Sequence, residues 1–229
     1  MTAFPTLPAM QIPAAIETVV RDSDFTHRIL RPQEPNGRTI VLMHGSGGDE
    51  TTLIPLAAKI DPHATLIGIR GRVVQEGVKR WYKRITPTSF DQTDIRAEAA
   101  AFASFFRDLS KREAIDLAQT TFLGYSNGAN LINALSVLEP DMVERAVLLR
   151  SMPVLDAIPN ANLAKAKVLT ITGENDTLYA PFGPKLEAMF RACGADVVAR
   201  TISAGHEVGD EDARIASEWL AGLKLASAK

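Results

Sequence analysis

The sequence predicts an α/β fold, in which a mostly parallel central sheet carries helices on both faces. Two observations support this prediction. Short β-branched and apolar segments alternate almost throughout the chain with longer segments whose apolar residues recur at helical spacing. Such alternation is typical of βαβ units. In addition, two glycine-containing loops, at 44–48 and 124–128, each lie between a predicted strand and a predicted helix.

The predicted strands are short runs rich in valine, isoleucine, leucine and threonine, bounded by turn-forming residues. The run from Thr39 to Met43 is the most apolar of the early ones, so we expect it near the centre of the sheet. In chain order, the predicted strands cover residues 25–30, 39–43, 64–69, 120–123, 145–149, 168–172 and 197–202.

The predicted helices follow these strands and are recognised by their spacing of apolar residues. The clearest is 92–110, where Ile95, Ala99, Phe102, Phe106 and Leu109 would share one face. Segment 71–87 shows no period, because it mixes glycine, basic and aromatic residues, and we predict it to be irregular. The other helices are predicted at about 53–60, 127–138, 184–193 and 211–223.

Length and composition favour a single domain that spans residues 1–229, with 1–20 as an extended lead-in. The 25 basic and 27 acidic residues give a net charge of −2, which offers no overall field for nucleic acid or an anionic membrane. Apolar runs are too short to span a bilayer, and no secretion signal is recognised. Cys193 is the only cysteine, which excludes an intrachain disulfide and a cysteine-based metal cluster.

The strongest functional motif is Gly124-Tyr125-Ser126-Asn127-Gly128. Gly-x-Ser-x-Gly is the pattern of a nucleophile elbow, in which a strand turns sharply into a helix and exposes a serine hydroxyl. The flanking segments predict this strand and this helix. An ordinary glycine-containing loop is the alternative interpretation.

A serine nucleophile needs a histidine base and a carboxylate that orients it. On a hydrolase sheet of this kind the order is serine, acid, histidine, and His206 is the only histidine after Ser126. The loop after the strand at 168–172 offers Glu174 and Asp176, and Asp156 is a weaker third possibility. The residues alone do not choose among these acids.

The glycine-rich loop at His44 to Gly48 has two interpretations. It lacks the glycine spacing and the lysine of a phosphate-binding loop, and the acidic Asp49 and Glu50 follow it directly. As an oxyanion loop it fits better, since its backbone N–H groups can face a developing negative charge. The expected donors are the N–H groups of Ser46 and Asn127.

The most basic segment, 70–84, contains the aromatic pair Trp81 and Tyr82. Basic and aromatic residues together can bind single-stranded nucleic acid, but no nucleic-acid-binding motif accompanies them. We predict instead that the segment folds over the carboxyl edge of the sheet and that the pair forms part of a substrate-pocket wall. A solvated loop with one anchoring aromatic residue is the alternative.

Taken together, these motifs resemble those of the phospholipase/carboxylesterase family of α/β-hydrolases. The resemblance implies that Ser126 is the nucleophile, Asp176 the acid and His206 the base, with Ser46 and Asn127 at the oxyanion hole. The substrate pocket is expected to involve His44, Trp81 and Tyr82. The motifs that carry the resemblance are His44 to Glu50, Arg70-Gly71-Arg72, Gly124 to Asn130, Gly173 to Asp176 and Gly205-His206-Glu207, in that order.

The resemblance further implies a cofactor-free, metal-free, cytoplasmic enzyme that is often dimeric and cleaves short-chain carboxylic esters of small molecules through an acyl-enzyme. Neither nucleic acid nor a membrane is expected as a partner. A thioesterase or lysophospholipase-type acyl hydrolase is an alternative, as is a ligand-binding protein without turnover. Trp81-Tyr82 departs from the paired phenylalanines of relatives, and Ser151 from a common proline, which affects the expected pocket shape.

Overall fold

The computed structural model describes residues 15–20 and 24–223, and it contains one eight-stranded sheet of order β1-β2-β4-β3-β9-β10-β11-β12. Strand β2 runs antiparallel to β1 and β4, and the remaining neighbours are parallel. The predicted α/β fold is therefore confirmed. The strands are β1 Ala15–Val20, β2 His27–Pro32, β3 Thr39–Met43, β4 Thr65–Ile69, β9 Thr120–Tyr125, β10 Arg145–Leu149, β11 Lys167–Gly173 and β12 Asp196–Ile202.

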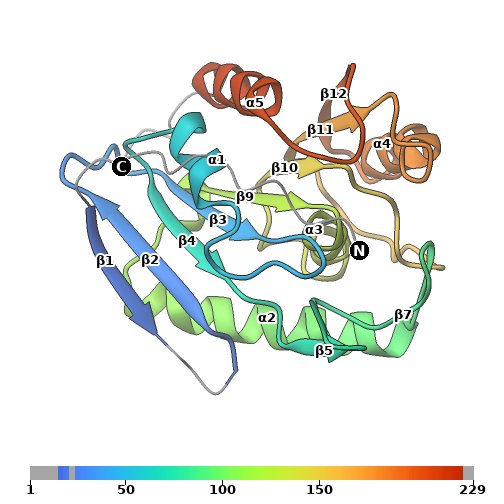
Figure 1. Cartoon of the computed structure of the whole chain (residues 1–229), viewed down its shortest axis with the longest axis horizontal. Coiled ribbons are helices and arrows are strands. Elements are labelled where there is room, and N and C mark those ends of the chain that lie inside the picture. The colour runs from blue at the N-terminus through green and yellow to red at the C-terminus, as the bar shows by residue number, and fades with distance from the viewer. Residues whose placement is uncertain (1–14, 21–23, 224–229) are drawn as a thin grey trace.

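The helices cover both faces of the sheet, with α1 and α5 above it and α2 below it in Figure 1. Residues of α1 and α5 share one apolar cluster with one face of the strands, and residues of α2, α3 and α4 share another with the opposite face. The helices are α1 Ile54–Ile60, α2 Gln92–Arg112, α3 Asn127–Leu138, α4 Gly183–Ala192 and α5 Asp210–Gly222, with short 3₁₀ turns at Leu117–Gln119 and Ala180–Phe182.

The central strand β3 sets the position of the two glycine-containing loops. All five of its residues are buried, as expected for a parallel strand covered on both faces. Met43 pairs with Gly124 of β9, and Tyr125 of β9 pairs with Leu149 of β10. Because the three strands end in register, the loops that follow them lie together at the carboxyl edge of the sheet.

Aromatic side chains fill the core between α2 and the sheet. Phe102 and Phe106, one turn apart on α2, both contact Phe122 of β9 at ring-centroid distances of 6.5 and 5.2 Å. Phe102 also meets Phe25 edge-on at 5.7 Å. Such pairs contribute about 0.5–1.5 kcal/mol each beyond their buried area. The helical spacing seen in the sequence therefore corresponds to the buried face of α2.

Two local predictions differ from the structure. The end of the expected lead-in, Ala15–Val20, is a strand at the edge of the sheet, and its exposed side chains at 17–19 explain why the sequence shows no alternation there. Residues 1–14 lie outside the described part of the chain. The segment expected to be irregular forms two small hairpins, from β5 Val73–Gln75, β6 Val78–Arg80, β7 Arg84–Thr86 and β8 Ser89–Phe90.

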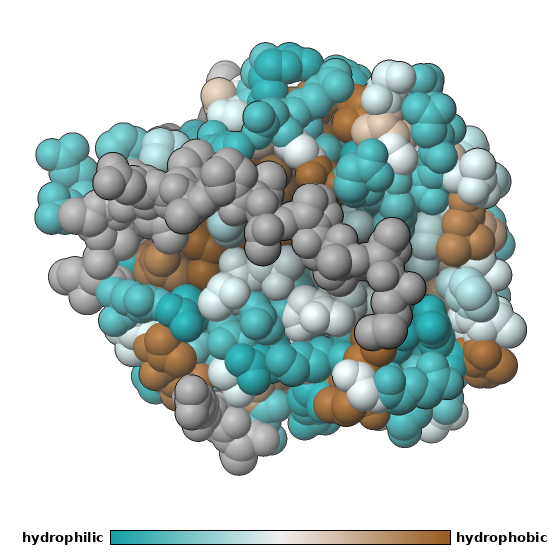
Figure 2. Space-filling model, viewed as in Figure 1, coloured by the Kyte–Doolittle hydropathy of each residue, from teal (hydrophilic) through white to brown (hydrophobic). Residues whose placement is uncertain are grey.

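Figure 2 shows one face of the molecule, on which hydrophilic residues predominate and apolar residues form small, separate groups. This is the usual distribution on a surface that contacts water. Within residues 15–20 and 24–223, no helix is both long enough and apolar enough to cross a bilayer.

Candidate active site

Ser126 lies at the sharp turn between β9 and α3. Its backbone has φ 49° and ψ −113°, a conformation that residues with a side chain rarely adopt. The Ser126 N–H donates to the Leu149 carbonyl at 2.8 Å, and the Ser126 carbonyl accepts from the Asn130 N–H at 2.9 Å. These two bonds fix the turn on both sides of the serine. The strained geometry of an elbow is therefore present.

The glycines on either side of Ser126 are required by close backbone packing. A Cβ atom on Gly128 would lie 2.1 Å from the Met43 carbonyl oxygen, and one on Gly124 would lie 2.6 Å from the Ala129 Cα. Both distances are shorter than real Cβ atoms tolerate. The Gly-x-Ser-x-Gly pattern thus reflects how tightly α3 approaches β3 and β9.

The structure brings Ser126, His206 and Asp176 into one hydrogen-bonded chain. His206 Nε2 lies 3.0 Å from Ser126 Oγ, and His206 Nδ1 lies 2.6 Å from Asp176 Oδ2. With Nδ1 protonated and donating to the carboxylate, Nε2 is left to accept the serine proton. Ser126 and Asp176 are 6% and 5% exposed, whereas the His206 side chain between them is 37% exposed.

Asp176 is held by its own loop after β11. Its Oδ1 atom accepts hydrogen bonds from the N–H groups of Leu178 and Tyr179 at 3.3 and 3.1 Å, which leaves Oδ2 directed at His206. Glu174 and Asp156, the other acids considered from the sequence, are exposed. Of the three carboxylates, Asp176 is the one that contacts the histidine.

A buried arginine that sequence reasoning did not assign holds the His206 loop. Arg150 follows β10 and is 1% exposed. Its Nε donates to the Gly205 carbonyl at 2.9 Å, and its Nη2 donates to the Glu207 carbonyl at 2.7 Å. Arg150 therefore binds the backbone on both sides of His206. Asp212 of α5 supplies the counter-charge at 2.7 Å. The signal in the sequence was an arginine directly after an apolar strand.

The loop from Gly45 to Gly48 turns back on itself beside the elbow. Gly47 has a φ of 85°, its N–H donates to the Lys79 carbonyl at 2.8 Å, and the Gly48 N–H donates to the Gly45 carbonyl at 3.1 Å. Within the described part of the chain, neither the Ser46 N–H nor the Asn127 N–H has a hydrogen-bond partner. Two backbone donors therefore remain available next to Ser126.

The residues expected to line the pocket, His44, Trp81 and Tyr82, are buried behind the site instead, with exposures of 1%, 1% and 0%. The Trp81 ring packs edge-on against Phe102 and its Nε1 donates to the His44 carbonyl at 2.8 Å. The reason is that the segment folds onto α2, where the aromatic pair joins the core. The expected pocket wall is therefore corrected to a supporting layer.

His44 supports the glycine loop through both ring nitrogens. Its Nε2 accepts the Gly71 N–H at 3.0 Å, and its Nδ1 lies 2.6 Å from the Gly45 carbonyl, to which it donates. Burial lowers the pKa of His44, and the hydrogen bond to Gly45 only partly opposes this effect. A neutral imidazole matches one donor and one acceptor.

Two tyrosines flank the His206 imidazole. Tyr179 stacks on it at a centroid distance of 4.7 Å, and Tyr125 lies at 5.3 Å. Burial raises the pKa of Tyr125 to about 12 and also raises that of Tyr179. Both phenols are therefore neutral near pH 7, and their rings limit how far the imidazole can move.

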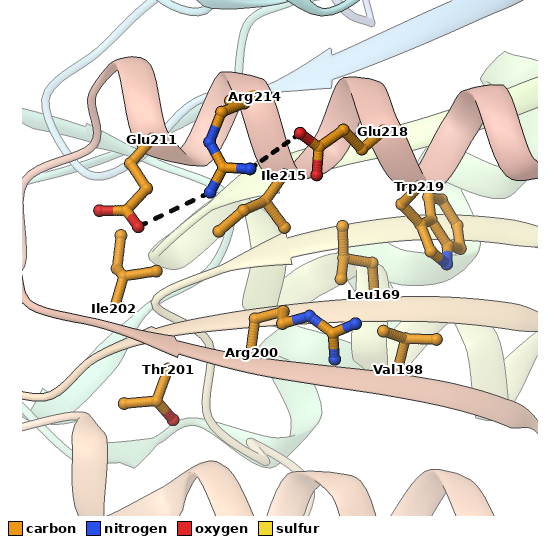
Figure 3. Close-up of a pocket in the computed structure, with 10 residues that line it drawn as sticks. All are labelled: Leu169, Val198, Arg200, Thr201, Ile202, Glu211, Arg214, Ile215, Glu218 and Trp219. Atoms are coloured by element: carbon orange, nitrogen blue, oxygen red, sulfur yellow. Dashed lines mark hydrogen bonds and ion pairs between the residues drawn. The ribbon is translucent and has the colours of Figure 1, made fainter.

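A separate groove of about 440 Å³ lies between α5 and β12 (Figure 3). Along α5, Arg214 pairs with Glu211 at 3.8 Å and with Glu218 at 2.8 Å, and Trp219 and Ile202 lie toward opposite ends of the groove. The groove contains none of Ser126, Asp176 and His206. Its remaining charged residue, Arg200, donates to the carbonyl of its neighbour Ala199 at 2.9 Å. Among the described residues, no cluster of histidine, cysteine and carboxylate groups has the geometry of a metal site.

The fold and this edge of the sheet define a class of protein. A mostly parallel sheet, a serine on a strained strand-to-helix turn, and an acid and a histidine on later loops are the features of an α/β-hydrolase.

Comparison with known proteins narrows the class. No family model matches the chain. A crystal structure of a carboxylesterase from Mesorhizobium loti is 48% identical, covers 90% of this chain and 99% of its own, and superposes with a TM-score of 0.87. The Bacillus cereus carboxylesterase is 26% identical over 87% of this chain and 95% of its own, with a TM-score of 0.83. A Bacillus subtilis (strain 168) protein named "Putative hydrolase MhqD" is 29% identical over 181 residues, which is 79% of this chain and 90% of its own.

The chain belongs to the phospholipase/carboxylesterase-type α/β-hydrolases. It is a carboxylic ester hydrolase.

Proposed function

We propose that this esterase cleaves short-chain carboxylic esters with a catalytic triad of Ser126, Asp176 and His206. The observation that carries the proposal is the continuous chain of contacts from the Ser126 hydroxyl through the imidazole to the Asp176 carboxylate, at 3.0 and 2.6 Å. Both lengths fall within the range in which a proton passes between a nucleophile and its base.

In the proposed mechanism His206 Nε2 takes the proton of Ser126 as its oxygen attacks the ester carbonyl carbon. The carbonyl oxygen becomes negatively charged and accepts hydrogen bonds from the N–H groups of Ser46 and Asn127. His206 then donates the proton to the departing alcohol, which leaves an acyl-enzyme. A water molecule, deprotonated by the same imidazole, releases the carboxylic acid and restores the serine.

The Asp176 carboxylate stabilises the imidazolium that forms in each half of the reaction and keeps the ring in the required tautomer. Arg150 acts one step further away, since it holds the backbone of Gly205 and Glu207 rather than the ring. Arg150 is therefore a positioning residue, whereas Ser126, His206 and Asp176 form the proposed triad.

The decisive experiment compares hydrolysis of p-nitrophenyl acetate, butyrate, octanoate and palmitate by the purified protein and by Ser126→Ala. We expect the variant to lose at least about 1,000-fold in kcat, because only the oxyanion donors and binding remain. Ser110→Ala, which removes a buried helix hydroxyl bonded to the Phe106 carbonyl at 2.6 Å, is the matched control and is expected to keep its activity.

The chain-length profile tests the finer part of the proposal. A maximum at acetate or butyrate supports short acyl chains, and a maximum at palmitate would move the assignment to a lysophospholipase-type acyl hydrolase. Turnover of acyl thioesters in preference to these esters would make it a thioesterase. Failure of a fluorophosphonate probe to label Ser126 would contradict the triad and favour a binding protein.

We also propose a cytoplasmic location and a homodimer, as the family resemblance implies. A single half-buried cysteine, Cys193, is compatible with a reducing cytoplasm. Fractionation of cells would test this location, and sedimentation of the purified protein would test whether it forms a homodimer.

A further inference from the structure

An arginine beside the proposed oxyanion loop carries a charge without a carboxylate partner. Arg80 ends strand β6 and is 4% exposed. Its Nη1 donates to Ser46 Oγ at 2.7 Å, and its Nε is buried with no hydrogen-bond partner. Across the described ranges, no carboxylate lies within ion-pair distance of this guanidinium.

Two other arginines of this chain show what the vacant edge of Arg80 can bind. Arg70 donates hydrogen bonds from Nε and Nη2 to the Glu50 carboxylate at 2.6 and 2.8 Å. Arg72 donates from the same two atoms to the Glu98 carboxylate at 2.8 and 3.2 Å. This planar pair of donors matches the two oxygens of a carboxylate. On Arg80 the same edge has no acceptor in the part of the chain that the structure describes.

Burying the unpaired guanidinium charge of Arg80 costs free energy. Burial, together with the neighbouring Arg84, lowers the pKa of Arg80, although an arginine stays protonated at neutral pH. Arg84 on β7 is half-buried and likewise has no ion-pair partner among the described residues. A buried charge is normally paired, so an uncompensated one beside a reactive serine indicates a bound anion.

Arg80 lies close to the proposed reacting groups. Ser46, whose hydroxyl binds Arg80, also supplies one proposed oxyanion donor, and standard bond lengths place Arg80 Nη1 within roughly 6 Å of the Ser46 N–H. The next residue, Trp81, donates its N–H to Asn127 Oδ1 at 2.8 Å, beside the other donor. Burial raises the pKa of Tyr179, and the charges of Arg84 and Arg80 oppose this rise at a ring stacked on His206.

We propose that Arg80, assisted by Arg84, binds a carboxylate of the substrate, so that the preferred esters are half-esters of short dicarboxylic acids. This inference rests on the proposed function, because it names the substrate of the same serine. The net charge of −2 describes the chain as a whole and not this local positive charge.

The distances limit the length of the acyl part. The free donors of Arg80 are Nε and Nη2, which lie about 2.3 Å from Nη1 and therefore within roughly 8 Å of the Ser46 N–H. The oxyanion and the substrate carboxylate each need about 2.9 Å to their donors. An acyl chain with about two methylenes between its carbonyl carbon and its carboxylate spans this separation. A succinyl half-ester is therefore the expected match, and hydrolysis converts it with one water into succinate, the alcohol and a proton.

The test compares monoethyl succinate with ethyl succinamate, in which a neutral amide replaces the carboxylate at nearly the same volume. Acid release at constant pH gives kcat/KM for both. We expect the wild-type enzyme to prefer the anionic ester by at least about 10-fold, as charge-assisted hydrogen bonds are worth that much or more. In Arg80→Gln the ratio of the two kcat/KM values should fall by about 10- to 100-fold. Arg80→Lys should recover part of it, because the charge stays but the planar pair of donors does not.

Arg84→Gln provides a second variant if Arg80→Gln does not fold, and it should lower the same ratio by about 3-fold, as expected for a less buried charge. Arg145→Gln is the matched control. Arg145 is also half-buried and has no ion-pair partner among the described residues, but it begins β10 at the opposite edge of the sheet. Its replacement should leave the ratio unchanged.

Three outcomes would overturn the inference. A wild-type ratio of one or less, with Ser126-dependent hydrolysis of the neutral ester, would remove the carboxylate site and leave the proposed function intact. An equal loss on both esters in Arg80→Gln would assign Arg80 to the oxyanion instead. If calorimetry detected no binding of succinate, the carboxylate site would also be contradicted. If succinate bound in an Arg80-dependent way to a protein without esterase activity, the carboxylate site would be supported and the proposed function refuted.

Discussion

Replacing Arg150 by methionine should separate two tasks of that residue, stability and the positioning of His206. The guanidinium pairs with Asp212 at 2.7 and 3.1 Å and donates to the carbonyls of Ile171, Gly205 and Glu207. Removing one partner of a buried pair costs about 3–5 kcal/mol, since the other charge is left uncompensated. For a chain of this length that corresponds to a fall in Tm of roughly 6–20 °C.

The effect on turnover has a different origin. Without Arg150 the carbonyls on either side of His206 lose their donors, and the imidazole is no longer fixed against Ser126. A displacement of about 1 Å in such a group lowers kcat by about 100-fold, with little change in KM. The assay is steady-state hydrolysis of p-nitrophenyl butyrate at a temperature where circular dichroism shows the variant folded.

The double variant Arg150→Met/Asp212→Asn distinguishes the two tasks. Asparagine removes the orphaned charge but still accepts the Gly209 N–H, which Asp212 does at 2.9 Å, so most of the stability should return. kcat should stay low. Arg191→Met, which removes an arginine bonded to the Val197 carbonyl at 3.0 Å on the far side of β12, is the control. If the double variant regained full kcat, or the single variant kept it within about threefold, the positioning argument would be refuted.

Three further predictions follow from the backbone and burial of the site. Ser126→Gly and Ser126→Ala should both lack turnover, but the glycine variant should be more stable by about 1 kcal/mol in urea unfolding, because φ 49° strains alanine and not glycine; equal stability would argue against strain. Gly128→Ala should destabilise the fold by more than about 3 kcal/mol, since its Cβ would meet the Met43 carbonyl at 2.1 Å, whereas Gly222→Ala on α5, with nothing within 4 Å, should be neutral or slightly stabilising. Burial lowers the pKa of His44 in the folded protein below its ordinary value of 6.5, so at acidic pH the unfolded chain binds more protons than the folded one. The contribution of His44 to stability is therefore complete above pH 6.5 and is lost as the pH falls from 6.5 through the pKa of the folded protein. Unfolding free energies measured between pH 5 and 8 should show this loss in the wild type and less of it in His44→Gln, and an identical pH dependence in both would contradict the assignment.

Local features of the sequence predicted most of the fold. The spacing of Phe102, Phe106 and Leu109 identified the buried face of α2, and the apolar run at 39–43 identified the central strand. Both depend on residues that are close in the chain, so the periods of helix and strand are visible without knowledge of the partners. The edge strand at 15–20 was missed because its side chains at 17–19 are exposed and leave no such period.

The sequence by itself determined the chain order of the alternating elements, the elbow around Ser126 and the candidacy of His206 as its base. Only the tertiary structure decided which groups meet. His206 contacts Ser126 and Asp176 across 80 and 30 residues, Arg150 reaches Asp212 across 62, and Trp81 turns into the core while Arg80 stays beside Ser46. The physical reason is that turn chemistry and hydrophobic period are properties of neighbouring residues. The contact of His206 with Asp176, and the burial of an arginine with or without a counter-charge, depend instead on strand register and packing between distant segments.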